Sequence, residues 1–149
     1  MSVTTFLVDA GFRSLNVLHR AVVRASGGRL GRRALGMEIV ELTTIGRRSG
    51  QPHRTMLTVP LVLGEQLVLV ASKGGDDRDP DWYVNLLTQP EVDVLWRGVH
   101  YEMRATPASE EQRAEWWPRI VAVYHPYASY QRRTTRPIPL VVCAPRTQS

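Results

Sequence analysis

The stretch from Met37 to Pro145 is a succession of short, β-branched segments separated by glycine turns. Residues 37–46, 53–63 and 65–72 follow one another closely, and a hairpin turn at Gly64-Glu65 separates the last two. Two more segments turn near Arg97-Gly98, and residues 137–145 form a last apolar run. Hairpin-length connections favour antiparallel pairing, because parallel strands need long crossovers. The pattern predicts a mainly β fold with helices (α+β), built on about six antiparallel strands in a barrel-like sheet.

Three segments have helical signals. Residues 79–89 predict a short helix with Asp79 as N-cap and Pro80 at its first position. Residues 109–124 begin with Ser109 as a cap and carry acids in the first turn. The N-terminal helix ends in a glycine- and arginine-rich connector. We expect one domain of 149 residues, with this helix and linker over 1–36 and the barrel core over 37–149.

The N-terminal segment is amphipathic and basic. Asp9, Arg13, Arg20 and Arg24 interrupt it, so it contains neither a signal-peptide core nor a membrane span. A cytoplasmic protein is therefore expected. The helix is predicted to pack on its own domain, and peripheral contact with the cytoplasmic face of a membrane is the alternative.

Several kinds of chemistry lack the residues they require. The single cysteine, Cys143, lies in an apolar run and predicts a buried thiol, without a disulfide or a thiolate metal cage. The four histidines stand without a partner at metal-site spacing, and the acidic cluster at 76–81 lacks the glycine and glutamate of a calcium loop. No nucleophile elbow, P-loop or dinucleotide fingerprint is present, so we expect no metal site and no hydrolytic triad.

The net charge of +5 is unevenly placed. Residues 1–60 carry nine arginines and three acids, a balance of +6, whereas residues 61–149 carry ten basic and eleven acidic residues. The excess of positive charge indicates an anionic partner: a phosphate- or carboxylate-bearing ligand, a membrane surface or nucleic acid. Nucleic acid is the least favoured, since no recognisable binding motif accompanies the charge.

Three stretches have the composition of binding segments. The first, GRRSGQPHR, offers turn backbone amides, a hydroxyl and planar guanidinium groups suited to oxyanions, although a solvated hairpin tip would look the same. Its candidates are Arg47, Arg48, Ser49, Gly50 and Arg54.

The second stretch is ASKGG, where a strand ends at Ser72 and is followed by Lys73 and Gly74. Lys73 is the one lysine in a chain with eighteen arginines, which hints at a specific use of a compact charge. The glycines would let backbone approach a ligand, but an ordinary strand-to-helix connection is the alternative.

The third stretch, YHPYASYQRRT, carries Tyr124, Tyr127 and Tyr130 at a spacing that keeps them on one side of a helical turn. They form either the wall of a cleft for a flat, conjugated ligand or ordinary tyrosine packing with one ring exposed.

Together, in this order and spacing, these stretches resemble the deazaflavin-dependent nitroreductase family of actinobacterial oxidoreductases. The resemblance runs from about Met37 to Pro145 and includes LTTIGRRSGQPHRTMLTV, VASKGGDDRDPDWYVNLLTQPEV, RAEWWPRIVAVYHPYASYQRRTTR and IPLVVCAP. It implies a split β-barrel like that of the FMN-binding proteins. It also implies coenzyme F420, a flavin-like hydride carrier with a phosphate and a polyglutamate tail.

The resemblance implies a role for each stretch. The hairpin residues Arg47, Arg48, Ser49, Gly50 and Arg54 would hold the phosphate and the start of the acidic tail. Ser72, Lys73 and Gly74 would line the rim where the ring enters, and Tyr124 would lie against it with the other two tyrosines on the substrate side. The expected catalytic groups are Tyr130 first, then Tyr127 and Ser72, which would orient or protonate the acceptor.

The implied activity is an F420H2-dependent reductase that passes a hydride to a quinone, a nitro compound or an activated enone. The chain departs from the family at Met56-Leu57, where members often have proline before leucine, and at residues 58–60, where known nitroreductases place an aromatic. These departures favour quinones over nitroimidazoles. The alternatives are an FMN-binding barrel oxidase or reductase and a non-catalytic F420 carrier, and the chain is expected to be a monomer or a homodimer.

Overall fold

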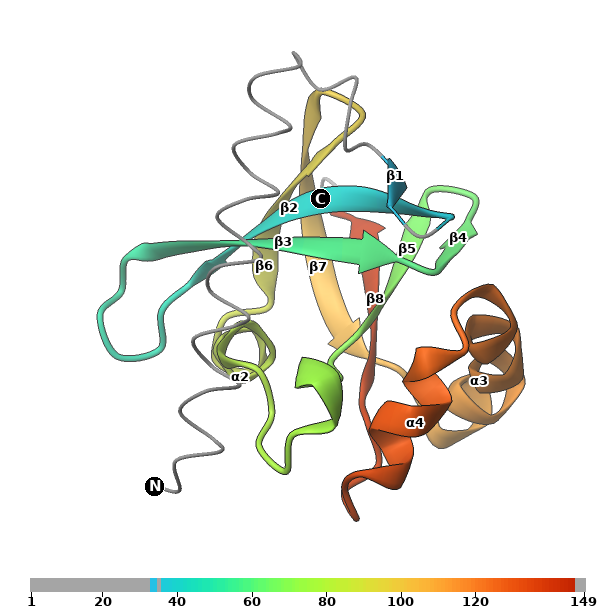
Figure 1. Ribbon diagram of the computed structural model, residues 1–149. Helices are drawn as coiled ribbons and strands as arrows, with labels where there is room; N and C mark the ends of the chain where they lie inside the picture. The colour runs from blue at the N-terminus through green and yellow to red at the C-terminus, as the bar shows by residue number, and fades with distance from the viewer. Residues whose placement is uncertain (1–32, 35, 147–149) are drawn as a thin grey trace.

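The computed structural model describes residues 33–34 and 36–146 as one curled antiparallel sheet with helices at its lower end (Figure 1). The strands are β1 (Arg33–Ala34), β2 (Met37–Ile45), β3 (Pro52–Val59), β4 (Leu61–Leu63), β5 (Gln66–Val70), β6 (Glu91–Trp96), β7 (Val99–Pro107) and β8 (Leu140–Pro145). The helices are the 3-10 turn η1 (Lys73–Gly75), α2 (Asp81–Thr88), α3 (Glu110–Val123) and α4 (Pro126–Arg132).

The strand order confirms the predicted antiparallel architecture. It runs β1-β2-β6-β7-β8-β5-β4, with β3 on the other side of β2, and each pairing is antiparallel. Side chains along β2 and β6 alternate between buried and partly exposed, as expected for strands with one face on a core. The short hairpins bring the chain back after each strand, so the sheet curls into a half-barrel.

The core lies on both sides of the curled sheet. One cluster fills the inside of the curl and includes Leu42, Leu69, Trp82, Leu86, Val94 and Val141. Trp82 is therefore a core anchor. A second cluster joins the sheet to α3 and α4 and includes Val68, Trp116, Ile120, Tyr127, Ile138 and Leu140.

The described residues form eight strands where about six were expected. One addition is β1, a two-residue strand within the predicted linker. The other arises at Pro60, which divides the predicted segment 53–63 into β3 and β4. Proline lacks the amide proton that a continuous ladder would need, so the pairing partner changes from β2 to β5 at this point.

The turns and the cap of α3 follow the sequence prediction. Arg97 and Gly98, both at positive φ (53° and 77°), form the two-residue turn between β6 and β7. The Ser109 Oγ accepts from the Gln112 amide at 3.1 Å, and the Gln112 side chain accepts from the Ser109 amide at 2.9 Å. Ser109 is therefore the cap that the sequence predicted, and Gln112 completes it as a capping box.

The predicted cap of α2 was wrong. The helix begins at Asp81 with Pro80 as its N-cap residue, and no side chain caps it. The Asp79 carboxylate instead accepts a hydrogen bond from Arg136 Nη1 at 2.9 Å. A guanidinium offers a stronger, charge-assisted bond than a backbone amide does, and so the carboxylate turns to Arg136.

The predicted N-terminal amphipathic helix and most of the predicted linker lie outside the described residues. Within residues 33–34 and 36–146, no helix is both long and apolar enough to cross a membrane. Cys143 is fully buried, as predicted.

Candidate active site

The loop between β2 and β3 is closed by its own backbone. The Gly46 amide donates to the Gln51 carbonyl at 2.8 Å, and the Gly50 amide donates to the Gly46 carbonyl at 2.9 Å. The Ser49 hydroxyl accepts from the Gln51 amide at 3.1 Å and lies 3.3 Å from Nε2 of His53. The tip is therefore an ordered turn, with Gly50 in the left-handed region at φ 69°.

Arg47 anchors this tip to α2. Its backbone amide and its Nη1 both donate to Oδ1 of Asn85, at 3.2 and 2.8 Å, and its Nη2 lies 3.4 Å from Asp81. Asn85 is 3% exposed and donates from Nδ2 to the buried Thr44 hydroxyl at 3.3 Å. Among the hairpin arginines, Arg47 thus has a structural task.

Asn85 is a residue that the sequence reasoning missed. It is a buried amide on a helix whose other buried side chains are apolar, Trp82 and Leu86. A lone amide in the run WYVNLL was the signal that could have marked it, because a polar group on an apolar face needs a partner.

The remaining hairpin cations are open to solvent. Arg48 is exposed at the tip. The Arg54 side chain is 54% exposed, and its Nε lies 3.9 Å from Glu41, which is a long, weakly held ion pair. These two guanidinium groups are the ones that can turn toward an anionic ligand without breaking a buried contact.

The stretch ASKGG forms a turn with an unusual backbone. Lys73, Gly74 and Gly75 all have positive φ, at 46°, 64° and 86°. Ser72 is buried, and its carbonyl accepts from the Gly75 amide at 2.9 Å. The turn presses against α4: a Cβ placed on Gly75 would lie 2.6 Å from the Tyr130 carbonyl oxygen.

The three tyrosines form one cluster of mutually contacting rings. The ring centroids of Tyr124 and Tyr127 are 5.0 Å apart, and that of Tyr130 lies 6.4 Å from Tyr124 and 6.0 Å from Tyr127. Tyr127 is 5% exposed, and its hydroxyl lies 3.2 Å from Thr58 Oγ1 on β3. The Tyr124 and Tyr130 hydroxyls are 3.4 Å apart, and both side chains are half-buried.

The surroundings favour the protonated phenols of Tyr127 and Tyr130. Burial raises the pKa of Tyr127, although the hydrogen bond with Thr58 opposes the shift. Burial, the hydrogen bond with Tyr124 and the neighbouring phenols raise the pKa of Tyr130 to about 12. Tyr130 therefore carries its proton at neutral pH, and its hydroxyl can donate a hydrogen bond.

Contacts connect the three predicted stretches. Arg47 ties the hairpin to α2, and the Lys73–Gly75 turn packs on α4, where Arg133 Nη1 donates to the Gly74 carbonyl at 3.1 Å. Arg136 joins the two sides, because it binds both Asp79, just before α2, and the Ser72 carbonyl. In Figure 1 the turn before α2 lies between α2 and α4 in the lower half of the view, and the β2–β3 hairpin projects at the left.

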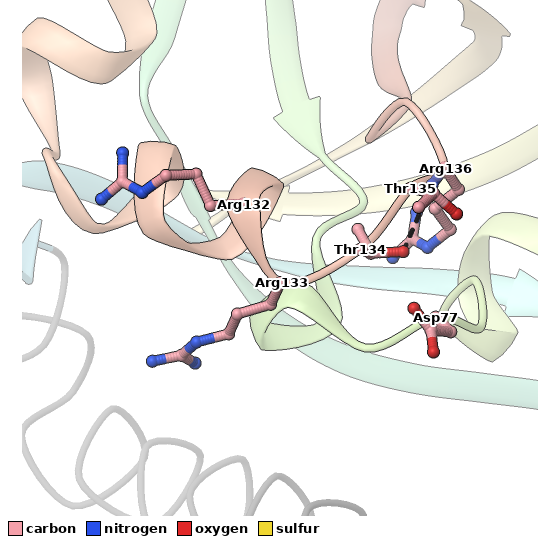
Figure 2. A pocket seen from close by; sticks show the side chains of 6 residues that line it. All are labelled: Asp77, Arg132, Arg133, Thr134, Thr135 and Arg136. Carbon is pink, nitrogen blue, oxygen red and sulfur yellow. Dashed lines mark hydrogen bonds between the residues drawn. The ribbon is translucent and has the colours of Figure 1, made fainter.

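A shallow hollow of about 410 Å³ lies beside this region, at the end of α4 (Figure 2). Its lining consists of Asp77, Arg132, Arg133, Thr134, Thr135 and Arg136. The side chains of Arg132 and Arg133 extend away from the threonines rather than converging, as Figure 2 shows. With its cations dispersed and an acid on its wall, the hollow has no focused anion site.

Comparison with known proteins decides the family. The profile of the family described as F420H(2)-dependent quinone reductase matches residues 16–145. The chain belongs to this family. An F420H(2)-dependent quinone reductase of Mycobacterium tuberculosis is 38% identical over 134 residues, which cover 87% of this chain and 89% of that protein.

Solved structures agree with this membership. An F420-H2 dependent reductase, FDR-A, superposes with a TM-score of 0.63 at 37% identity, covering 70% of this chain and 92% of its own. A second structure, described as a domain-swapped dimer, superposes with a TM-score of 0.66 at 32% identity, covering 95% of this chain and 99% of its own. These findings confirm the split-barrel fold and the recognition of an F420-dependent oxidoreductase family. The roles of individual residues stay predictions.

Proposed function

We propose that this chain reduces quinones with reduced coenzyme F420, and that the site lies where α4 meets the Ser72–Gly75 turn. The observation that carries the proposal is the packing of Tyr130 on that turn, in a chain that belongs to the F420H(2)-dependent quinone reductase family. The packing places ionisable phenols beside a turn at the end of a strand. Ligands are commonly held at such loops.

The residues at the site suit a ligand that is anionic at one end and flat at the other. Arg48 and Arg54 would hold the phosphate and the acidic tail, on a turn whose Ser49 and Gly50 are already ordered. Arg47 contributes by fixing the turn on Asn85. Ser72, Lys73 and Gly74, with Tyr124, would hold the ring end.

Reduction of a quinone to a quinol consumes one hydride, with its two electrons, and one proton. When bound, reduced F420 supplies the hydride. The proton is the task of Tyr130, whose hydroxyl would donate to a quinone oxygen and whose half-buried position allows reprotonation from solvent. Tyr127, held at Thr58, and Ser72 would orient the acceptor.

The choice of a quinone over a nitro compound rests on the description of the family and on the residues of β3. This chain has Thr58 and Val59 where known nitroreductases place an aromatic, and Thr58 is committed to Tyr127. A pocket wall at this position would be small and polar on one side.

The test is a steady-state assay of reduced F420 with a menaquinone-type quinone, a nitroimidazole and an activated enone. The proposal predicts the highest kcat/KM for the quinone and a loss of about 10- to 100-fold in kcat for Tyr130→Phe. If the protein bound F420 but reduced none of these acceptors, it would instead be a carrier. A preference for the nitroimidazole would contradict the choice of acceptor.

We infer a homodimer as the oligomeric state. The inference is supported by the relative described as a domain-swapped dimer, which matches 95% of this chain. Light scattering of the purified protein should give twice the chain mass of 16.8 kDa, and a mass of one chain would contradict the inference.

We also propose that the protein is cytoplasmic and binds the inner face of a membrane through its basic N-terminal segment. Its support is the run of arginines in residues 1–36 and a membrane-dissolved class of acceptor. Co-sedimentation with anionic vesicles, lost on deletion of residues 1–25, is the expected result; equal sedimentation of both forms would refute it.

A further inference from the structure

The turn that carries Ser72, Lys73 and Gly74 has a backbone that is costly to maintain. Three successive residues have positive φ, and Lys73 among them has a side chain. A non-glycine residue in the left-handed region costs on the order of 1 kcal/mol. The turn therefore needs support from outside its own sequence.

That support comes mainly from Arg136. Its guanidinium makes five hydrogen bonds: to the Ala71 carbonyl from both Nη atoms at 3.3 Å, to the Ser72 carbonyl at 3.0 Å, to the Asp76 carbonyl at 2.9 Å and to the Asp79 carboxylate at 2.9 Å. The carbonyls lie on both sides of the turn, two before it and one after it. The planar fork thus brackets the turn, a geometry that the point charge of lysine does not reproduce.

Arg136 is itself held in place. Its side chain is 15% exposed, and its carbonyl accepts from Gln131 Nε2 at 2.8 Å. The Gln131 Oε1 accepts in turn from the Ile138 amide and from Arg113 Nη2, at 2.9 and 2.8 Å. Because Gln131 follows Tyr130 on α4, the tyrosine helix and the turn share one anchor.

The neighbouring arginines do not duplicate this role. Arg133 makes one bond to the turn, to the Gly74 carbonyl, and is exposed. Arg132 is exposed and donates to Ser129 Oγ at 3.0 Å, within its own helix.

We propose that Arg136 is a positioning residue for the cofactor site: its guanidinium holds the Lys73–Gly75 turn in the left-handed conformation that cofactor binding requires. The consequence for binding rests on the proposed function, whereas the effect on the turn does not. Asp79 assists by fixing one edge of the guanidinium, but the three carbonyl contacts do the positioning.

The test compares Arg136→Lys and Arg136→Gln with Arg132→Lys as the matched control and with Asp79→Asn, which leaves the carbonyl bonds in place. Two different Arg136 variants are made, so that the test can be carried out even if only one of them folds. Amide hydrogen exchange of residues 71–79 is measured without cofactor, and the Kd for F420 is measured by fluorescence at saturating and limiting protein concentrations.

In the Arg136 variants, exchange in residues 71–79 should quicken by about tenfold or more, while the sheet keeps the protection of the parent protein. The Kd for F420 should rise by about tenfold or more, and kcat at saturating F420 should change less than the KM for F420. Arg132→Lys and Asp79→Asn should stay within about threefold of the parent in both readouts.

Parent-like exchange and Kd in both Arg136 variants would overturn the proposal, as would an equal effect of Asp79→Asn. A parent protein that fails to bind F420 would refute the proposed function alone. The exchange comparison would then still decide whether Arg136 holds the turn.

Discussion

Nη1 of Arg47 lies 2.8 Å from Oδ1 of Asn85, and the backbone amide of Arg47 donates to the same oxygen at 3.2 Å. The contact joins residues 38 positions apart and fastens the β2–β3 hairpin to α2. Arg47 of the GRRSG motif thus stabilises the fold, and its neighbour Arg48 is exposed at the tip. This anchor would fix the position of the hairpin for the anion binding proposed for Arg48 and Arg54.

Replacing Asn85 by alanine should test this anchor. The substitution leaves the Arg47 amide and the Thr44 hydroxyl without their partner at a site that is 3% exposed, so the free energy of unfolding should fall by about 1–3 kcal/mol. Urea denaturation measures it. Asp81→Ala removes a contact at 3.4 Å from a side chain that is 84% exposed, and should change stability by less than about 0.5 kcal/mol. Equal losses in the two variants would contradict the anchor.

Gly75→Ala should be more harmful than an equivalent change at another left-handed glycine. Both Gly75 and Gly64 have positive φ, at 86° and 63°, so alanine is strained at either position. A Cβ at Gly64 meets nothing within 4 Å, whereas at Gly75 it meets the Tyr130 carbonyl at 2.6 Å. We expect losses of about 1 kcal/mol for Gly64→Ala and about 2–4 kcal/mol for Gly75→Ala in thermal unfolding. The same loss in both would show that α4 does not press on the turn.

Stability should fall at high pH through Tyr130. Its pKa rises from 10.0 to about 12 on folding, so the native state holds the phenol proton more tightly than the unfolded state. Below pH 10 both states are protonated, and between pH 10 and 12 the unfolded chain ionises first, which lowers the free energy of unfolding. Tyr130→Phe should make the decline over this window shallower. Parallel pH profiles for the two proteins would disprove the shift.

Cys143 should resist modification in the native protein. It is fully buried, and burial raises the pKa of its thiol to about 12, so neither access nor thiolate is available at neutral pH. A thiol-reactive disulfide reagent should label it only in denaturant, with one equivalent per chain. Rapid labelling without denaturant would contradict this packing.

Local chemistry explains why much of the fold was predictable. The glycine at Gly64 and the Arg97-Gly98 pair set hairpins through their own backbone preferences, and the Ser109 box closes within four residues. A proline such as Pro60 is expected to disturb a strand. Whether it bends the strand or divides it depends on which strands lie beside it.

For the candidate site, the sequence marked three stretches but did not show which contact each of their residues makes. Arg47 and Arg48 are adjacent, chemically identical and both exposed, yet Arg47 is anchored on Asn85 at 2.8 Å. Asp79 was likewise predicted to cap α2, but its carboxylate accepts a hydrogen bond from Arg136, 57 residues later in the chain. Tyr127, grouped with the substrate wall, is buried against Thr58. Long-range partners decide such roles, and a single sequence does not display them.

The most direct measurement is a side-by-side titration of the protein with coenzyme F420 and FMN, followed by fluorescence of each. The account predicts saturable binding of F420 with a micromolar or lower Kd, weakened in Arg48→Ala and Arg54→Ala, and much weaker binding of FMN. Tight binding of FMN together with no binding of F420 would contradict it.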